Sequence, residues 1–128
     1  MLYTRHYTLA EAQHTLEEIK PKLEELVSLK KLMDEKGYDV FKHQYFGGMG
    51  PNGQKAFPLQ LERLVEIVRE FGERQIEVKD LSRGLIDFPH LRKDGEEVYL
   101  CYLLGETSIL SWHTITGGFA GRRSLEEL

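Results

Sequence analysis

The second half of the sequence gathers the side chains best suited to bind a ligand. The stretch VKDLSRGLIDFP, residues 78–89, contains Asp80, Arg83 and Asp87, and His113 follows in the segment SILSWHTI. Carboxylate and imidazole groups are common ligands of divalent metal ions, and imidazole also titrates near neutral pH. We therefore predict that Asp80, Asp87 and His113 bind a metal, with one divalent ion as the expected cofactor.

A second group of residues is suited to anions. The segment TGGFAGRR combines glycines, which let backbone amides approach a ligand, with arginines, whose planar guanidinium groups match carboxylate or phosphate. Arg83 and Arg122 are the predicted contacts of a small anion or cofactor. In the alternative, the glycines only let the chain turn across a sheet, Phe119 enters the core, and the arginines pair with Asp80 or Asp87. The sequence leaves both alternatives open.

Each predicted metal ligand also has a structural explanation. An aspartate in a glycine-containing turn commonly accepts backbone amides, and a neighbouring arginine pairs with its carboxylate. A single histidine in a strand is often a hydrogen-bonded residue of the core or its rim. In both cases we expect Asp80, Asp87 and His113 to form a network with the C-terminal arginines, at the edge where the sheet meets the tail.

Cys101 is the only cysteine. No internal disulfide can form, and a paired CxxC metal or redox motif is absent from the sequence. The expected strand pairing points Cys101 and His113 to opposite faces, which argues against a nucleophile and base pair. We predict an inert buried thiol. Glu106 is placed on the order of 20 Å from His113 along the strand, too far to share a site with it.

The candidate residues lie on strands that begin after Gln75. IEVKDL, LIDF, EEVYLCYLL and SILSWHTI are short apolar runs bounded by turn residues, which predicts an antiparallel meander with a turn at Asp94-Gly95. If Leu104 pairs with Ile109, then Cys101 faces Trp112 and Leu100 faces His113. We place Asp87 beside Leu100, on the face of His113. The sequence does not fix this parity, because one residue of slip moves Asp87 to the Cys101 face.

The first half of the sequence predicts two helices. Thr8 and Glu11 form a capping box that starts a helix at about Leu9, an apolar stripe continues through Pro21 with an expected kink, and Gly37 ends it. A second helix runs from Pro58 to Gly72, with Leu61, Leu64, Val68 and Phe71 as its apolar stripe. Residues 38–56 between the helices are expected to be a loop. Its glycines and Lys55 do not match a phosphate-binding P-loop, because Gln54 separates glycine from lysine.

These elements predict an α+β fold in which a long antiparallel helical hairpin packs on a small antiparallel β-meander. We expect a single domain over residues 1–128, with the hairpin at about 8–73 and the meander and tail at about 75–128. Both faces of the predicted central strands are apolar. The helices can cover one face, so the other requires the C-terminal segment or a second subunit, and we expect a homodimer.

Composition narrows the class of protein. The chain has 128 residues, 41% hydrophobic and 30% charged, with a formal net charge of −4. This balance is typical of a globular protein and lacks the positive field that nucleic-acid binding requires. No apolar run is long enough to cross a membrane, and the first residues do not resemble a secretory signal. The expected location is the cytoplasm, without nucleic acid or membrane partners.

The ordered motifs KDL, GLIDFP, YLC, GE, WH and GFAGR, with the opening YTLAEA, carry a family resemblance. The chain resembles an uncharacterised prokaryotic family, domain of unknown function 2203, over nearly its whole length. The resemblance implies a small cytosolic bacterial or archaeal protein. It supplies no activity and no established site residue. Its motif residues are Asp80, Arg83, Asp87, Cys101, Glu106, Trp112, His113 and Arg122.

The sequence therefore predicts a metal-ion or small-anion binding protein with an Asp, His and Arg cluster at the sheet and the C-terminal tail. The alternative is a non-catalytic dimeric structural or protein-interaction module. No catalytic residue is identified, so an enzyme is the less favoured hypothesis.

Overall fold

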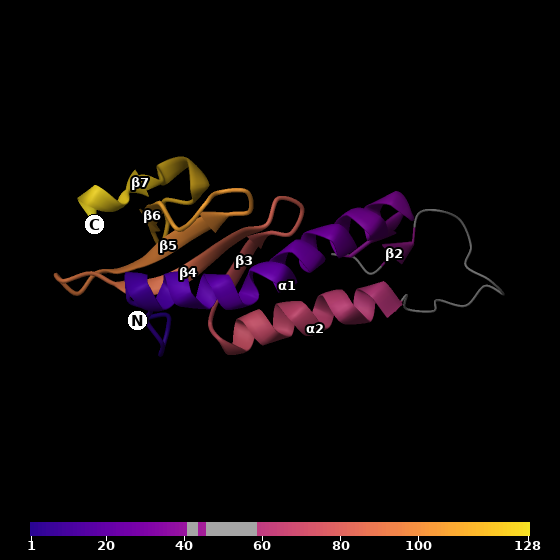
Figure 1. Ribbon diagram of the computed structural model, residues 1–128, viewed down its shortest axis with the longest axis horizontal. Helices are drawn as coiled ribbons and strands as arrows, with labels where there is room; N and C mark the ends of the chain where they lie inside the picture. The colour runs from indigo at the N-terminus through magenta and orange to yellow at the C-terminus, as the bar shows by residue number, and fades with distance from the viewer. Residues whose placement is uncertain (41–43, 46–58) are drawn as a thin grey trace.

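A computed structural model describes residues 1–40, 44–45 and 59–128. It has an α+β fold in which two helices lie along one side of a five-stranded antiparallel sheet (Figure 1). The helices are α1 (Leu9–Glu35) and α2 (Leu59–Glu73), and two short strands, β1 (Tyr38–Asp39) and β2 (Gln44–Tyr45), pair between them. The sheet strands are β3 (Glu77–Asp80), β4 (Leu85–Leu91), β5 (Glu97–Leu103), β6 (Ser111–Thr114) and β7 (Arg123–Ser124).

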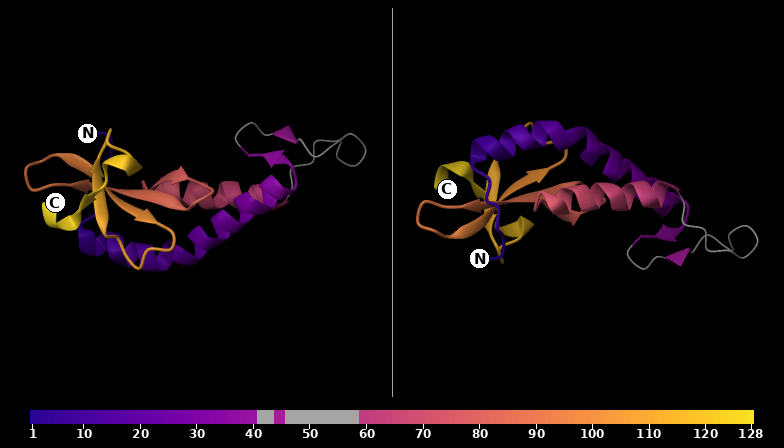
Figure 2. Two further views of the ribbon diagram at one scale, coloured as in Figure 1. Left: turned by 90° about the horizontal axis from the view of Figure 1, so that it is seen from above. Right: turned by 90° about the horizontal axis from the view of Figure 1, so that it is seen from below.

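Helix α1 begins and ends where the sequence predicts. The amide of Glu11 donates to Thr8 Oγ1 over 3.1 Å, and the amide of Thr8 donates to Glu11 Oε1 over 2.9 Å, which completes the capping box. The helix continues through Pro21 and is bent over its length (Figure 2). Gly37 follows its C-cap with a φ of +74°, the left-handed conformation that glycine adopts without steric cost.

The sequence predicts that helix α2 ends at Gly72, but the helix continues to Glu73. Gln75, with a φ of +58°, takes the left-handed position that follows the helix end. The amide of Ile76 donates to the carbonyl of Phe71, and that of Gln75 to the carbonyl of Gly72, each over 2.9 Å. These two bonds form a Schellman motif. The Gln75 side chain is bonded to Thr4 at both ends of its amide group, which offsets the cost of this backbone conformation. The predicted start at Pro58 lies outside the described residues.

The two helices run antiparallel, as predicted, and ion pairs join them along their length. Glu18 pairs with Arg74 over 2.9 Å, Glu25 pairs with Arg63 over 2.9 Å, and Lys22 pairs with Glu70 between them. The hairpin extends beyond the end of the sheet, so only part of it packs on the strands (Figure 1). The predicted loop 38–56 contains the β1–β2 pair, and the glycine-rich stretch compared with a P-loop lies outside the described residues.

The sheet is the predicted antiparallel meander with an additional strand. Its strand order is β3-β4-β5-β6-β7, so each strand pairs with the next one in the sequence. Gly95, with a φ of +90°, forms the β4–β5 turn and donates its amide to the carbonyl of Arg92 over 2.9 Å. Strand β7 carries no signal in the sequence pattern, because it is only two residues long. The C-terminal segment therefore adds an edge strand to the sheet.

The predicted strand register is wrong by one residue at two places. His113 pairs with Tyr99 rather than Leu100, and Asp87 pairs with Cys101 rather than Leu100. The physical cause at β6 is a long connection in place of a tight hairpin. Ile109 leaves the sheet and exchanges hydrogen bonds of 3.1 Å with the side-chain amide of Gln13 on α1, so it cannot pair with Leu104.

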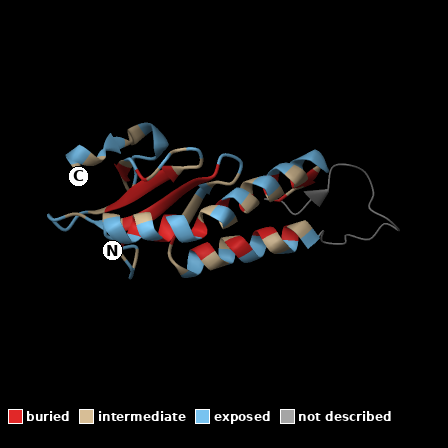
Figure 3. Ribbon diagram, viewed as in Figure 1, coloured by how far each residue is buried: buried red, intermediate tan, exposed pale blue. Residues whose placement is uncertain are grey.

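The two sheet faces are buried by different parts of the chain. On one face, Phe88, Leu100 and Trp112 join the core formed with helices α1 and α2. On the opposite face, Tyr99 and Cys101 are also buried, and Figure 1 places the C-terminal segment on the side of the sheet away from the helices. Figure 3 shows that the central strands are buried along most of their length. Within the described residues, neither helix is long and apolar enough to cross a lipid bilayer.

Candidate metal centre

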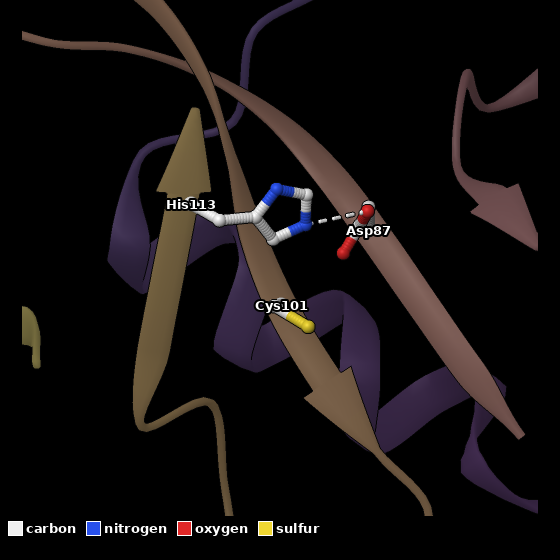
Figure 4. Close-up of side chains that lie close together, drawn as sticks. All are labelled: Asp87, Cys101 and His113. Carbon is white, nitrogen blue, oxygen red and sulfur yellow. Dashed lines mark hydrogen bonds and ion pairs between the residues drawn. The ribbon is translucent and has the colours of Figure 1, made fainter. Parts of the chain in front are cut away.

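Three buried side chains that can bind a metal ion meet on the sheet face away from the helices. Asp87, Cys101 and His113 come from β4, β5 and β6, and Figure 4 shows the three side chains directed toward one another. One carboxylate oxygen, the thiol sulfur and one imidazole nitrogen all lie within 4.8 Å of each other. The three residues are 1%, 0% and 3% exposed, in the order named.

The strand register brings these residues together. Asp87 lies directly opposite Cys101, and His113 lies opposite Tyr99, two residues before Cys101 on the same face. Directly opposite and diagonal neighbours on one sheet face are within side-chain contact distance. The predicted association of Asp87 with His113 is therefore present. The two register errors each moved one of these residues by one position, so their effects on this pair cancel.

The hydrogen bonds of His113 define the orientation of its ring. Nδ1 donates to the carbonyl oxygen of Thr114 over 2.7 Å, because a carbonyl can only accept. Nε2 lies 2.8 Å from Oδ2 of Asp87. Burial acts to lower the pKa of His113, but its hydrogen bond to Asp87 and the charge of that carboxylate outweigh burial and raise the pKa above its usual value.

The position of Cys101 differs from the prediction. It shares a face with His113 and Asp87, whereas the predicted register placed it on the opposite face from both. The prediction that its side chain is buried is confirmed. Burial raises the pKa of the Cys101 thiol, and the negative charge of Asp87 raises it further. The thiol is therefore protonated near neutral pH and is not an activated nucleophile.

The carboxylate of Asp87 is only partly satisfied. Oδ2 bonds to His113, but within the described part of the chain Oδ1 is buried without a hydrogen-bond partner. Buried polar atoms in folded proteins nearly always have a partner, and a bound ion or water molecule commonly supplies it where the chain does not. The unpaired oxygen belongs to the same cluster as the thiol and the imidazole.

Asp80 and Arg83 lie outside this cluster, in the turn between β3 and β4. Oδ1 of Asp80 accepts the amides of Ser82 and Arg83 over 2.9 and 3.0 Å, and Oδ2 accepts Nε of Arg83 over 2.9 Å. The Arg83 hydrogen bonds lower the pKa of the Asp80 carboxyl. Both residues thus have the structural role that the sequence analysis gave as the alternative to ligand binding.

Arg122 pairs with Glu106 rather than with an aspartate. One guanidinium nitrogen lies 2.8 Å from each oxygen of that carboxylate. Phe119 does not enter the core as the alternative proposed, because it is 38% exposed and its ring contacts the guanidinium groups of Arg83 and Arg122. Both arginines predicted to contact an anion are therefore paired with carboxylates, and neither contacts Asp87.

Cys101 is the cluster member that sequence reasoning missed. Whether Cys101 shares a sheet face with His113 depends on the strand register across the β5–β6 connection, because a shift of one residue moves His113 to the other face. The segment LLGETSIL contains one glycine and no two-residue turn signal such as Asn-Gly, so its length does not define a register. A longer, irregular connection would have allowed Cys101 and His113 to share a face.

The comparisons with known proteins give one match. The model of the family described as "Uncharacterized conserved protein (DUF2203)" matches residues 5–125. No curated protein and no solved structure matches this chain. The matched range contains all three residues of the cluster and nearly the whole described fold. The chain belongs to the DUF2203 family of uncharacterised conserved proteins.

Proposed function

We propose that this protein binds one divalent transition-metal ion, of which Zn²⁺ is the best chemical fit, through Asp87, Cys101 and His113. The observation that supports the proposal is a buried carboxylate oxygen without a partner, within a cluster that also offers a thiol sulfur and an imidazole nitrogen. A bound cation would give Asp87 Oδ1 a partner. The proposal keeps Asp87 and His113 from the predicted ligands and replaces Asp80 with Cys101.

The donor set favours zinc-like ions over Mg²⁺ or Ca²⁺. Those harder ions take oxygen ligands, six or more for Ca²⁺ and near-octahedral for Mg²⁺. Zn²⁺ is bound by cysteine sulfur, histidine nitrogen and carboxylate oxygen, usually four ligands in all. Three side chains from this chain would leave one position for a water molecule or another small ligand. A buried site with one sulfur and one nitrogen donor matches this chemistry.

The hydrogen bonding of His113 also supports the proposal. Metal-bound histidines usually donate their second ring N–H to a carbonyl or carboxylate, which fixes the tautomer and the ring orientation. In this chain Nδ1 donates to the carbonyl of Thr114 and Nε2 faces the cluster. A metal ion would take the place of the proton that Nε2 shares with Asp87.

Metal binding at this cluster would be coupled to proton release. A cysteine ligand must be deprotonated, and the raised pKa of Cys101 means that the ion has to displace its proton. The raised pKa of His113 adds a second proton that competes with the ion at lower pH. Affinity is therefore expected to increase as the pH rises.

Titration of the metal-free protein with Co²⁺ tests the proposal. We expect one Co²⁺ per chain with an absorption band from cobalt–thiolate charge transfer, displaced by Zn²⁺ and weaker at lower pH. Cys101→Ser should abolish the band, and His113→Ala or Asp87→Asn should weaken binding by at least about tenfold. Asp80→Asn is the matched control, since Asp80 was also a predicted ligand but lies in the β3–β4 turn, and it should bind normally.

Two outcomes of the titration would refute the proposal. If the wild-type protein binds no stoichiometric Co²⁺ or Zn²⁺, the proposal is wrong. It is also wrong if Asp80→Asn and Asp87→Asn have equal effects, because binding would then not depend on the buried cluster.

A further inference from the structure

The candidate metal centre is closed to solvent in the described structure. None of its three residues is more than 3% exposed. An ion that enters or leaves must therefore displace part of the chain that covers this sheet face. The first residues of the chain contact Tyr99 on this face, and the C-terminal segment lies on the same side of the sheet. Within the sheet, Lys79 of β3 also lies over the Tyr99 ring, at 4.7 Å from its centroid.

The first segment, Met1–His6, is named here the N-terminal strap. Its Tyr3 hydroxyl donates to Oε1 of Glu77 over 2.7 Å and also bonds to the hydroxyl of Tyr99. The ring of Tyr99 in turn lies 5.3 Å from the ring of His113, centroid to centroid. Tyr3 is thus separated from a proposed metal ligand by a single side chain.

Polar contacts hold the strap against the sheet. Glu97 accepts the amides of Leu2 and Tyr3 over 2.8 and 3.2 Å, and its Oε2 lies 2.7 Å from Nε2 of His6. Gln75 accepts the amides of Thr4 and Arg5 over 3.0 and 3.1 Å. Two side chains therefore satisfy four strap amides, and no strap residue is fully buried. Segments with few buried apolar contacts open at low free-energy cost.

Tyr7, which follows the strap, and the C-terminal cover are attached to the sheet in a different way. Tyr7 is 1% exposed, packs edge-on against Phe88, and donates its amide to the carbonyl of Pro89 over 2.7 Å. It can remain in place while the strap opens. The C-terminal cover is part of the sheet through β7, and Trp112 Nε1 donates to the carbonyl of Ser124 over 3.0 Å. No residue from Ile115 to the end of the chain is fully buried either, but this cover pairs with β6 through the β7 backbone, whereas the strap is held through side chains.

We infer that the N-terminal strap controls access to the Asp87, Cys101 and His113 cluster, and that its release from Glu97 and Tyr99 lets a metal ion enter and leave. The inference rests on the proposed metal-binding function. It assigns regulation of exchange to the strap, with Tyr3 and Glu97 as the residues that keep it closed.

The accessibility of Cys101 measures strap opening without any metal. Metal-free protein is reacted with a small aromatic disulfide reagent under native conditions, and the rate of thiol labelling is followed. Tyr3→Phe removes only the hydroxyl, and Glu97→Gln removes the charge that holds two amides and His6. Each variant should be labelled about tenfold faster or more, the effect of losing a charge-assisted hydrogen bond.

A matched control separates strap opening from general destabilisation. Glu25→Gln makes the same chemical change in an ion pair with Arg63 between the helices, which is more exposed than the Glu97–His6 pair and lies away from the cluster. Its labelling rate should stay close to that of the wild type. Equal acceleration in Glu25→Gln, or unchanged labelling in both strap variants, overturns the inference. Acceleration only in Arg122→Ala would do so too, because it would assign the opening to the C-terminal segment.

Release of Co²⁺ to a chelator is the second readout. Strap variants should release the ion faster by the same factor as their labelling increases, with little change in equilibrium affinity. If the wild-type protein binds no Co²⁺, the metal-binding function fails and the exchange role falls with it, while the labelling result still decides whether the strap covers Cys101. The two failures are thus distinguishable.

Discussion

At the scale of single residues, the pair of Asp87 and His113 is the contact that the sequence predicts best. A buried aspartate in an apolar strand requires a donor, and this requirement is independent of the exact register. The same reasoning could not identify Cys101, because its face depends on one residue of parity in a connection without a defining turn. Chemical necessity therefore predicted a partner more reliably than strand alignment did.

The Asp87 and His113 pair is expected to make stability depend on pH in the metal-free protein. The pKa of His113 is raised in the folded state, so its contribution is fully present below the unfolded value of about 6.5 and is lost as the pH rises through the folded value. Asp87→Asn should therefore cost most at acidic pH, on the order of 3 kcal/mol, and less at alkaline pH.

Urea unfolding at pH values of about 5.5 and 8.5, with NMR titration of the His113 ring, checks this prediction. The ring should titrate at lower pH in Asp87→Asn than in wild type, and Asp80→Asn should leave it unchanged. Identical titration curves for wild type and Asp87→Asn would show that the two residues do not interact in solution.

At the scale of elements, the sequence correctly predicts the ends of α1, which are set by local residues. It does not predict the end of α2, which is set by long-range contacts. Thr8 with Glu11 and Gly37 are complete local signals, and α1 begins and ends at them. The end of α2 is set instead by Gln75, whose side chain bonds to residues 71 and 70 positions away in the sequence. A left-handed glutamine is not expected from local propensity, so the nearby Gly72 was chosen.

Two glycine substitutions test this account of the elements. Gly72 lies within α2 with open space at its Cβ position, so Gly72→Ala should stabilise the protein by up to about 1 kcal/mol. Gly84 has a φ of +72°, and a Cβ atom there would lie 2.8 Å from Cβ of Leu104. Gly84→Ala should destabilise by about 2 kcal/mol or more.

Thermal or urea unfolding of the two alanine variants provides the measurement. The free energy of unfolding should increase in Gly72→Ala and decrease in Gly84→Ala. Destabilisation by Gly72→Ala would indicate that this residue does terminate the helix in solution, as the sequence analysis predicted.

At the scale of the whole molecule, the sequence predicted the α+β class and the meander order but not how the second sheet face is covered. The homodimer was inferred from the apolar character of that face. The buried side chains of Tyr99 and Cys101 show that one chain covers it at these positions, which removes this argument. The sequence does not show which segments cover this sheet face, because the strap and the C-terminal tail contain few apolar residues.

The homodimer itself remains a prediction. Exposed apolar side chains that a second subunit could cover include Leu59 and Val65 on α2, at 78% and 38% exposure. Sedimentation velocity at micromolar concentration is the measurement, with a dimer as the predicted species. A single monomeric species would refute the assembly and leave the metal-binding proposal unaffected.

The strand order has a consequence for the time course of folding. Each sheet strand pairs with its neighbour in sequence, so the meander forms through local contacts, which generally form early and fast. The contacts of Leu2 and Tyr3 with Glu97 join residues 95 and 94 positions apart, and closing so large a loop is entropically unfavourable until the sheet exists. The strap is therefore expected to dock last. A newly folding chain would present Asp87, Cys101 and His113 assembled before the strap closes, and loading with metal would be fastest in that interval.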